Sequence, residues 1–280
     1  MNEKTRSVAV RIATGCIILP AALALMWLPR CQIAFALFIS SLACVGLYEY
    51  YGIVRARAIS PETIGSILAG TLVTFSGYFH DAAATSLVLY GGCLLVAALH
   101  IVRGQHSVAG LASSVFGVLY VGWLASHILL MHRTPTVGPG MVTLLFVSVI
   151  LTDTAAYAIG SLFGKHKLAP KVSPGKTWEG AIAGFVFALA GAMLIYALKQ
   201  RTGWHGLPAW SVWTYLVAGA ALSIAAQIGD LTESCLKRDA GVKDSGGLFP
   251  GHGGVLDRCD GFLFAAPVLY YMFVPILLKT

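Results

Sequence analysis

Long apolar runs recur along the whole of this 280-residue chain, and they limit its fold more than any other feature. A helix needs about 20 apolar residues to cross the hydrocarbon core of a bilayer. In lipid every backbone N–H and C=O group must be satisfied within the protein, which favours helices for such runs. Nine segments are long enough, at approximately 12–28, 32–53, 63–79, 83–102, 109–131, 141–163, 181–198, 212–229 and 262–278. The sequence therefore predicts an all-α, polytopic transmembrane bundle of about nine spans.

The composition agrees with a membrane protein and excludes several other classes. Only 11% of the residues are charged and 57% are hydrophobic, whereas about a quarter of a soluble domain is charged. The net charge of +7 does not indicate nucleic-acid binding, because the basic residues lie in short segments between apolar runs. The six cysteines form no CxxC pair and no zinc-like spacing, so we expect neither disulfides nor a metal cluster.

The distribution of lysine and arginine predicts the orientation of the chain. With the N-terminus inside, fourteen of the nineteen basic residues fall in cytoplasmic segments, in agreement with the positive-inside rule. The first apolar run is then a retained signal anchor. Two polar loops, 164–180 and 230–260, are predicted on the cytoplasmic side, where a soluble nucleotide can reach them. We divide the chain into N-terminal helices, 1–140, and a C-terminal catalytic region, 141–280.

One polar segment, 229–261, stands out from the apolar sequence around it. Basic residues and glycines alternate in it with half of the twelve acidic residues of the chain, namely Asp230, Glu233, Asp239, Asp244, Asp257 and Asp260. Carboxylates bind hard divalent cations, basic side chains bind phosphates, and glycines let backbone N–H groups approach a ligand closely. The segment therefore predicts chemistry on a phosphate compound.

Asp230 follows directly after an apolar run, where an unpaired carboxylate is costly. If the helix continues, Asp230, Glu233, Ser234 and Lys237 share one of its faces. The alternative is a solvated helix end with an i,i+4 pair between a glutamate and a lysine.

Asp257 and Asp260 lie at the predicted start of the last helix, where capping alone would favour carboxylates. Together, Asp230 and Asp257 are candidate Mg²⁺ ligands. His252 is a candidate base or phosphate donor, although a plain hydrogen-bonding role is the more common one for a loop histidine.

The loop 164–180 carries four lysines and a Pro-Gly turn, which suit the triphosphate of a nucleotide or anionic lipid headgroups. Ordinary surface charge against anionic lipids is the alternative. Lys176 stands in a sequence similar to a phosphate-binding P-loop, but that pattern fails because Pro170 replaces its first glycine. Two acids within predicted spans are further candidates, Asp153 first and Glu49 second, since buried intramembrane acids are functional by default.

The polar segment resembles the signature of the phosphatidate cytidylyltransferases, also called CDP-diglyceride synthetases. The resemblance rests on the runs 234–238 (SCLKR), 243–246 (KDSG) and 249–260 (FPGHGGVLDRCD). Upstream, 153–157 (DTAAY) and 171–180 (KVSPGKTWEG) are similar to the bacterial members, so the likeness is specific over roughly 150–262. The one departure is Cys259, where the family usually has an aliphatic residue or threonine.

The resemblance implies a Mg²⁺-dependent enzyme that makes CDP-diacylglycerol and pyrophosphate from CTP and phosphatidic acid for phospholipid biosynthesis. It also implies a multi-pass protein of the bacterial plasma (inner) membrane, a cytoplasmic active site and a homodimer. A second, monovalent cation stays open.

The same resemblance makes Asp230 and Asp257 the metal ligands. The residues expected to act in catalysis are Asp230, Asp257, Lys237, Arg238 and Asp260. Those expected to bind substrate are Ser234, Lys243, Asp244, His252, Gly253, Gly254, Arg258, Lys176 and Asp153.

Three other classes compete with this prediction. An ion-coupled transporter would explain acids within the spans, but the sequence shows no internal repeat of the kind expected for one. A CDP-alcohol phosphotransferase would need a DGxxAR motif, and Asp260-Gly261 is followed by Phe262-Leu263-Phe264 instead. A purely structural membrane protein leaves the clustered acids unexplained.

Overall fold

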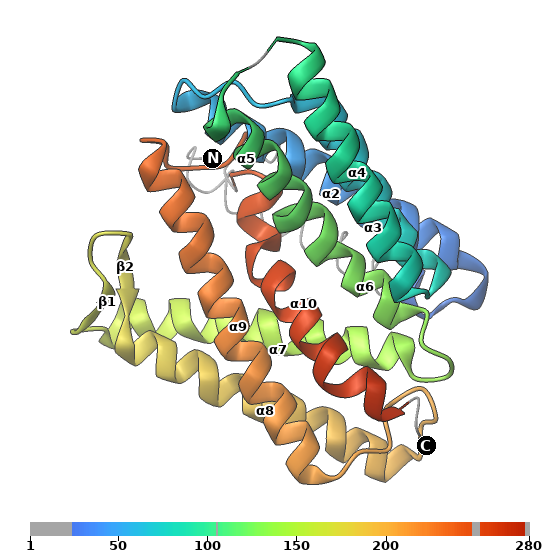
Figure 1. Cartoon of the computed structure of the whole chain (residues 1–280). Coiled ribbons are helices and arrows are strands. Elements are labelled where there is room, and N and C mark those ends of the chain that lie inside the picture. Colours follow the sequence, from blue (N-terminus) through green and yellow to red (C-terminus); the bar gives the residue numbers. More distant parts are fainter. Residues whose placement is uncertain (1–23, 105, 248–252, 278–280) are drawn as a thin grey trace, which may run out of the picture.

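The computed structural model describes residues 24–104, 106–247 and 253–277 (Figure 1). Nearly all of its regular structure is helical. The α-helices are α2 (Gln32–Ala56), α3 (Thr63–Ser76), α4 (Ala82–Val102), α5 (Val108–Gly117), α6 (Leu124–His132), α7 (Gly138–Phe163), α8 (Trp178–Thr202), α9 (Val212–Asp239) and α10 (Leu256–Leu277). Shorter helical turns are η1 (Pro29–Cys31), η2 (Gly77–Phe79) and the π-helical η3 (Val118–Trp123), and the two strands are β1 (Lys167–Ala169) and β2 (Ser173–Thr177).

The all-α, membrane-spanning fold class is confirmed. Among the described residues, six helices are long and apolar enough to cross a membrane: α2, α4, the continuous α5–η3–α6, α7, α8 and α9. The segment Thr63–Phe79 is a shorter apolar helix. The first predicted span lies largely outside the described residues. The total of about nine spans and the cytoplasmic N-terminus therefore stay predictions.

Polar side chains fix where several helices begin. Asp81 accepts hydrogen bonds from the N–H groups of Ala83 and Ala84 at the start of α4, and Thr177 accepts one from Gly180 at the start of α8. Such caps satisfy N–H groups that have no partner within the helix. The predicted run 181–198 therefore extends to Trp178, because the cap and not hydrophobicity marks the start of the helix.

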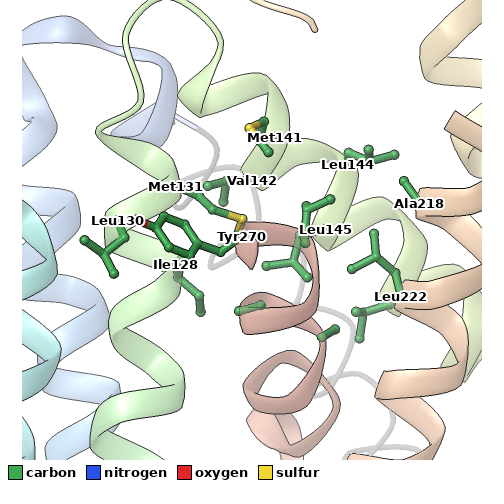
Figure 2. Close-up of a cluster of buried hydrophobic side chains, with 14 of the residues drawn as sticks. Ile128, Leu130, Met131, Met141, Val142, Leu144, Leu145, Ala218, Leu222 and Tyr270 are labelled. Atoms are coloured by element: carbon green, nitrogen blue, oxygen red, sulfur yellow. The ribbon is translucent and has the colours of Figure 1, made fainter. Parts of the chain in front are cut away.

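Helix α10 occupies the centre of the molecule, between α6 and α9 (Figure 1). Figure 2 shows buried side chains on both sides of α10, with Tyr270 beside Met131 of α6 on one side and with Leu145 of α7 and Leu222 of α9 on the other. This cluster draws residues from both sides of position 140. The two predicted regions therefore share one hydrophobic core.

Small residues allow α7 and α8 to pack closely. A Cβ atom on Gly180 would lie 2.6 Å from the carbonyl oxygen of Ala156, and one on Gly184 would lie 2.7 Å from that of Thr152. Both distances are shorter than van der Waals contact. Close packing at small residues is the usual way for helices to associate in lipid.

The two predicted polar loops differ from expectation in form. Residues 230–239 belong to α9 and 256–260 to α10, so only 240–255 connects helices. Within 164–180, β1 and β2 form an antiparallel hairpin with Lys167 opposite Thr177. The sequence analysis predicts no strands there, because the stretch is too short and too polar to show alternation.

Candidate active site

A cavity of about 310 Å³ lies between the β-hairpin and the adjoining parts of α7, α8 and α9. It forms where the C-terminal halves of α7 and α9 meet the N-terminus of α8. Its polar lining includes Asp153, Lys176, Thr177, Gln227 and Asp230. Three of these five residues, Asp153, Lys176 and Asp230, are site residues predicted from the sequence.

Lys176 and Asp230 form an ion pair in this cavity. The distance from Nζ of Lys176 to Oδ2 of Asp230 is 2.6 Å, and the two side chains are 24% and 37% exposed. Strand β2 carries Lys176 and α9 carries Asp230, so the hairpin brings the ammonium group against α9 nine residues before the helix ends. Both groups are accessible to a ligand that enters the cavity.

Asp153 also lines the cavity, but it is not the buried acid that the sequence predicts. Its side chain is exposed, because α7 turns this position toward the open cavity. It lies within electrostatic range of Asp230, Lys176 and Arg258. Asp260, which is buried at 7% exposure, lies within range of Asp153 and Asp230. Asp153, Asp230 and Asp260 therefore lie close enough to repel one another, and Lys176 pairs with Asp230.

A second charged cluster joins α9 to the start of α10. Nζ of Lys237 lies 2.6 Å from Glu233 and 2.5 Å from Oδ1 of Asp257. The side chain of Glu233 is 1% exposed and that of Lys237 is 12% exposed. The i,i+4 pair between Glu233 and Lys237 that the alternative predicts is therefore present, but it is enclosed against α10, whereas Arg238 and Asp239 in the last turn of α9 are exposed.

The other oxygen of Asp257 binds the connecting segment. Oδ2 accepts hydrogen bonds from the N–H and hydroxyl of Ser245, at 3.0 and 2.9 Å, and from the N–H of Gly254 at 2.7 Å. Gly253 adopts φ +79, and a Cβ atom on it would lie 2.6 Å from Asp257 Oδ2. Glycine is therefore required at this position. Asp257 does more than cap its own helix, since it also binds Lys237.

The remaining predicted residues are spread around these two clusters. On α9, Ser234 lies 3.5 Å from Asp230, and Arg238 donates to the carbonyl oxygen of Val172 in the hairpin. Exposed residues on the connecting segment and the first turn of α10 are Lys243, Asp244 and Arg258. None of these three lines the cavity. The predicted residue His252 lies outside the described residues.

Glu49 is the residue whose importance the sequence analysis underestimates. It lies on α2 and its side chain is buried, at 5% exposure. It accepts hydrogen bonds from the hydroxyl of Ser245 and from the backbone N–H groups of Val255 and Leu256 at the start of α10. Its signal in the sequence is the cost of a carboxylate within an apolar run. That signal marks the residue but does not identify its partners. Gln227 and Thr177, which line the cavity, give no such signal.

These features define an integral membrane protein with a charged cavity at one end of its helices. The chain belongs to the cytidylyltransferase family, whose sequence profile matches residues 9–275. The predicted resemblance is thereby confirmed, and the protein is an enzyme of this family.

Individual relatives extend the similarity over almost the whole chain. The phosphatidate cytidylyltransferase of Brucella suis is 36% identical over 260 residues, which cover 93% of this chain and 91% of the relative. That of Bacillus subtilis is 32% identical and covers 94% and 96%. The chloroplastic phosphatidate cytidylyltransferase 4 of Arabidopsis thaliana is also 32% identical, over 97% of this chain and 72% of the relative.

Proposed function

We propose that this enzyme transfers a cytidylyl group from CTP to phosphatidic acid, and that it acts at the cytoplasmic face of the bacterial plasma membrane. The names of relatives that match nearly the full chain support the substrates. The observation that carries the proposal is the Lys176–Asp230 pair in a cavity at the ends of apolar helices. A lipid phosphate and a water-soluble triphosphate can meet at such a position.

The reaction needs charge neutralisation more than a covalent nucleophile. A phosphate oxygen of phosphatidic acid attacks the α-phosphorus of CTP, and the bond from that phosphorus to the bridging oxygen breaks. Pyrophosphate leaves with the bonding electrons, and CDP-diacylglycerol forms. The lipid phosphate is already ionised at neutral pH, so the step requires no strong general base. Positioned cations therefore supply most of the catalysis.

Two lysines are held where they can serve this step. Lys176 is oriented by Asp230 in the cavity, and Lys237 is oriented by Glu233 and Asp257 where α9 meets the start of α10. The ammonium group of each lysine can exchange its carboxylate partner for a phosphate oxygen with only a small movement of the side chain. Ser234 is assigned as a hydrogen-bond donor.

The remaining predicted residues complete the assignment. Arg238, Lys243 and Arg258 are assigned to the triphosphate and the lipid phosphate, and Asp244 and Asp260 orient them. Gly253 and Gly254 keep the connecting segment close to Asp257.

The carboxylates near the cavity have the chemistry of a Mg²⁺ site, with Asp230 and Asp257 as its proposed ligands. Asp153, Asp230 and Asp260 repel one another, and the buried Oε1 of Glu233 has no hydrogen-bond partner among the described residues. A hard cation bound to Asp230 would relieve the repulsion among the three aspartates. Both oxygens of Asp257 already accept hydrogen bonds, so a metal there would replace at least one. The described residues contain no group of three or more His, Cys, Asp or Glu side chains arranged around a common metal position. When bound, Mg²⁺ would supply positive charge to the phosphate oxygens.

The first test uses the purified full-length protein in detergent with phosphatidic acid and CTP labelled in its α-phosphate, with and without Mg²⁺. We expect label to enter the lipid phase only when Mg²⁺ is present. Label that never enters the lipid phase, with protein shown to be folded, would refute the proposal and favour the transporter alternative.

The same assay tests Asp257 against a matched control. Asp257→Asn weakens the bond to Lys237, and we expect kcat to fall by about 100-fold or more, as for loss of a positioned electrostatic group. Asp239→Asn removes a carboxylate of α9 that pairs on the surface with Arg57, and should change kcat less than about twofold. Normal activity of Asp257→Asn would remove Asp257 from the site and leave Asp230 and Asp260 as the acids to test. The homodimer stays a prediction from the resemblance.

A further inference from the structure

Glu49 connects the N-terminal helices to the candidate active site. Its carboxylate is buried on α2 and lies against the start of α10, about two hundred residues further along the chain. Oε1 accepts a hydrogen bond from the N–H of Val255 at 3.1 Å, and Oε2 accepts one from the N–H of Leu256 at 2.8 Å. These N–H groups belong to a helix N-terminus, whose dipole favours the negative charge.

Two glycines make room for this carboxylate. A Cβ atom on Gly246 or on Gly254 would collide with the oxygens of Glu49. The backbone at Gly246 and at Gly254 therefore lies directly against the carboxylate of Glu49. The carboxylate of Glu49 thus has backbone N–H donors and closely placed glycines, neither of which a side chain that only fills space in the core requires.

Ser245 extends the contact from Glu49 to Asp257. Its hydroxyl lies 3.1 Å from Oε2 of Glu49 and 2.9 Å from Oδ2 of Asp257. One hydroxyl proton serves one acceptor at a time, so the serine links the two carboxyl groups in alternation. Asp257 binds Lys237 through its other oxygen. A continuous series of hydrogen bonds thus runs from α2 to the lysine of α9.

We propose that Glu49 is a positioning residue of the transferase site, which holds Ser245 and the start of α10 so that Asp257 can orient Lys237. The inference rests on the proposed function. Glu49 touches neither substrate nor metal in this scheme. It acts by keeping Ser245 and the start of α10 in place, and a displacement of about 1 Å in a catalytic group is enough to reduce a rate by about 100-fold.

The test compares two buried glutamates of the N-terminal helices. Glu49→Gln turns an amide N–H₂ group toward backbone donors that need an acceptor. Glu62→Gln is the matched control. Glu62 is also buried, but it lies at the start of α3 and pairs with Arg103. We expect Glu49→Gln to lower kcat by about tenfold or more, with the KM for phosphatidic acid unchanged. The kcat of Glu62→Gln, expressed per amount of folded protein, should equal that of wild type.

A double-mutant cycle separates positioning from general loss of structure. If Glu49 acts through Ser245, then Glu49→Gln combined with Ser245→Ala should be no slower than the slower single variant. If the two substitutions acted independently, their fold-reductions in kcat would multiply in the double variant. A kcat of Glu49→Gln within twofold of wild type, an equal loss in Glu62→Gln, or multiplicative effects would each overturn the proposal.

Amide hydrogen exchange tests Glu49 without reference to activity. The N–H groups of Val255 and Leu256 should exchange at least about tenfold faster in Glu49→Gln and at the wild-type rate in Glu62→Gln. Exchange at the wild-type rate in both variants would overturn the role of Glu49. Inactive wild-type protein would refute only the proposed function, because the exchange comparison still judges Glu49.

Discussion

Lys176 reaches Asp230 from a strand, across more than fifty residues of sequence. Its neighbour Lys171 lies at the exposed turn of the same hairpin, and its side chain does not line the cavity. Of the four lysines of this stretch, the sequence analysis assigns only Lys176 to substrate binding, and the structure gives the physical reason for the difference. Because the hairpin register turns one of them into the cavity, they are not equivalent in the structure.

This difference predicts unequal effects of two similar substitutions. Lys176→Ala should lower kcat/KM for CTP by about 100-fold, since it removes a positioned cation from the cavity. Lys171→Ala removes the same charge from the surface and should change kcat/KM by less than about threefold. Steady-state kinetics with labelled CTP measure both. Equal losses would mean that the hairpin acts only through its total charge.

At the scale of the helix, most boundaries follow from local sequence. The predicted segment 63–79 and the predicted start at position 212 coincide with the structure, because hydrophobicity and a cap mark them. α10 begins six residues before the predicted 262, at Leu256. Hydrophobicity does not mark this first turn, because Asp257 and Asp260 are charged and the partners that hold them are known only from the structure.

The close packing of α7 and α8 leads to a prediction on stability. Gly184→Leu would place a side chain against the backbone of Thr152, and overpacking of this kind costs about 1–3 kcal/mol. We expect a lower Tm in detergent. Gly91→Leu is the matched control on α4, where a Cβ atom meets nothing within 4 Å, and its Tm should stay near that of wild type. If both variants melted alike, α7 and α8 would not depend on glycine for their packing.

At the scale of the whole molecule, the cavity lies at one end of the bundle, and the distribution of lysine and arginine predicts that this end faces the cytoplasm. Single cysteines in a background without the six native ones test this orientation. Lys171→Cys, in the hairpin, should react with a membrane-impermeant maleimide only in inverted vesicles. Arg201→Cys, at the opposite end of α8, should react only in right-side-out vesicles. The reverse pattern would move the cavity to the outer face.

The sequence by itself determines the class of the fold and the approximate helices, and it predicts many of the residues that we propose for the site. Hydrophobic run length, helix caps and the polar motif are properties of neighbouring residues, so they can be read in chain order. The pairing of charged side chains cannot be predicted in this way. Which acid meets which lysine, and that Glu49 meets the start of α10, depend on how α2, α9 and α10 pack. Only the tertiary structure decides these contacts, because they join side chains that are remote in sequence and are fixed by the burial of whole helix faces.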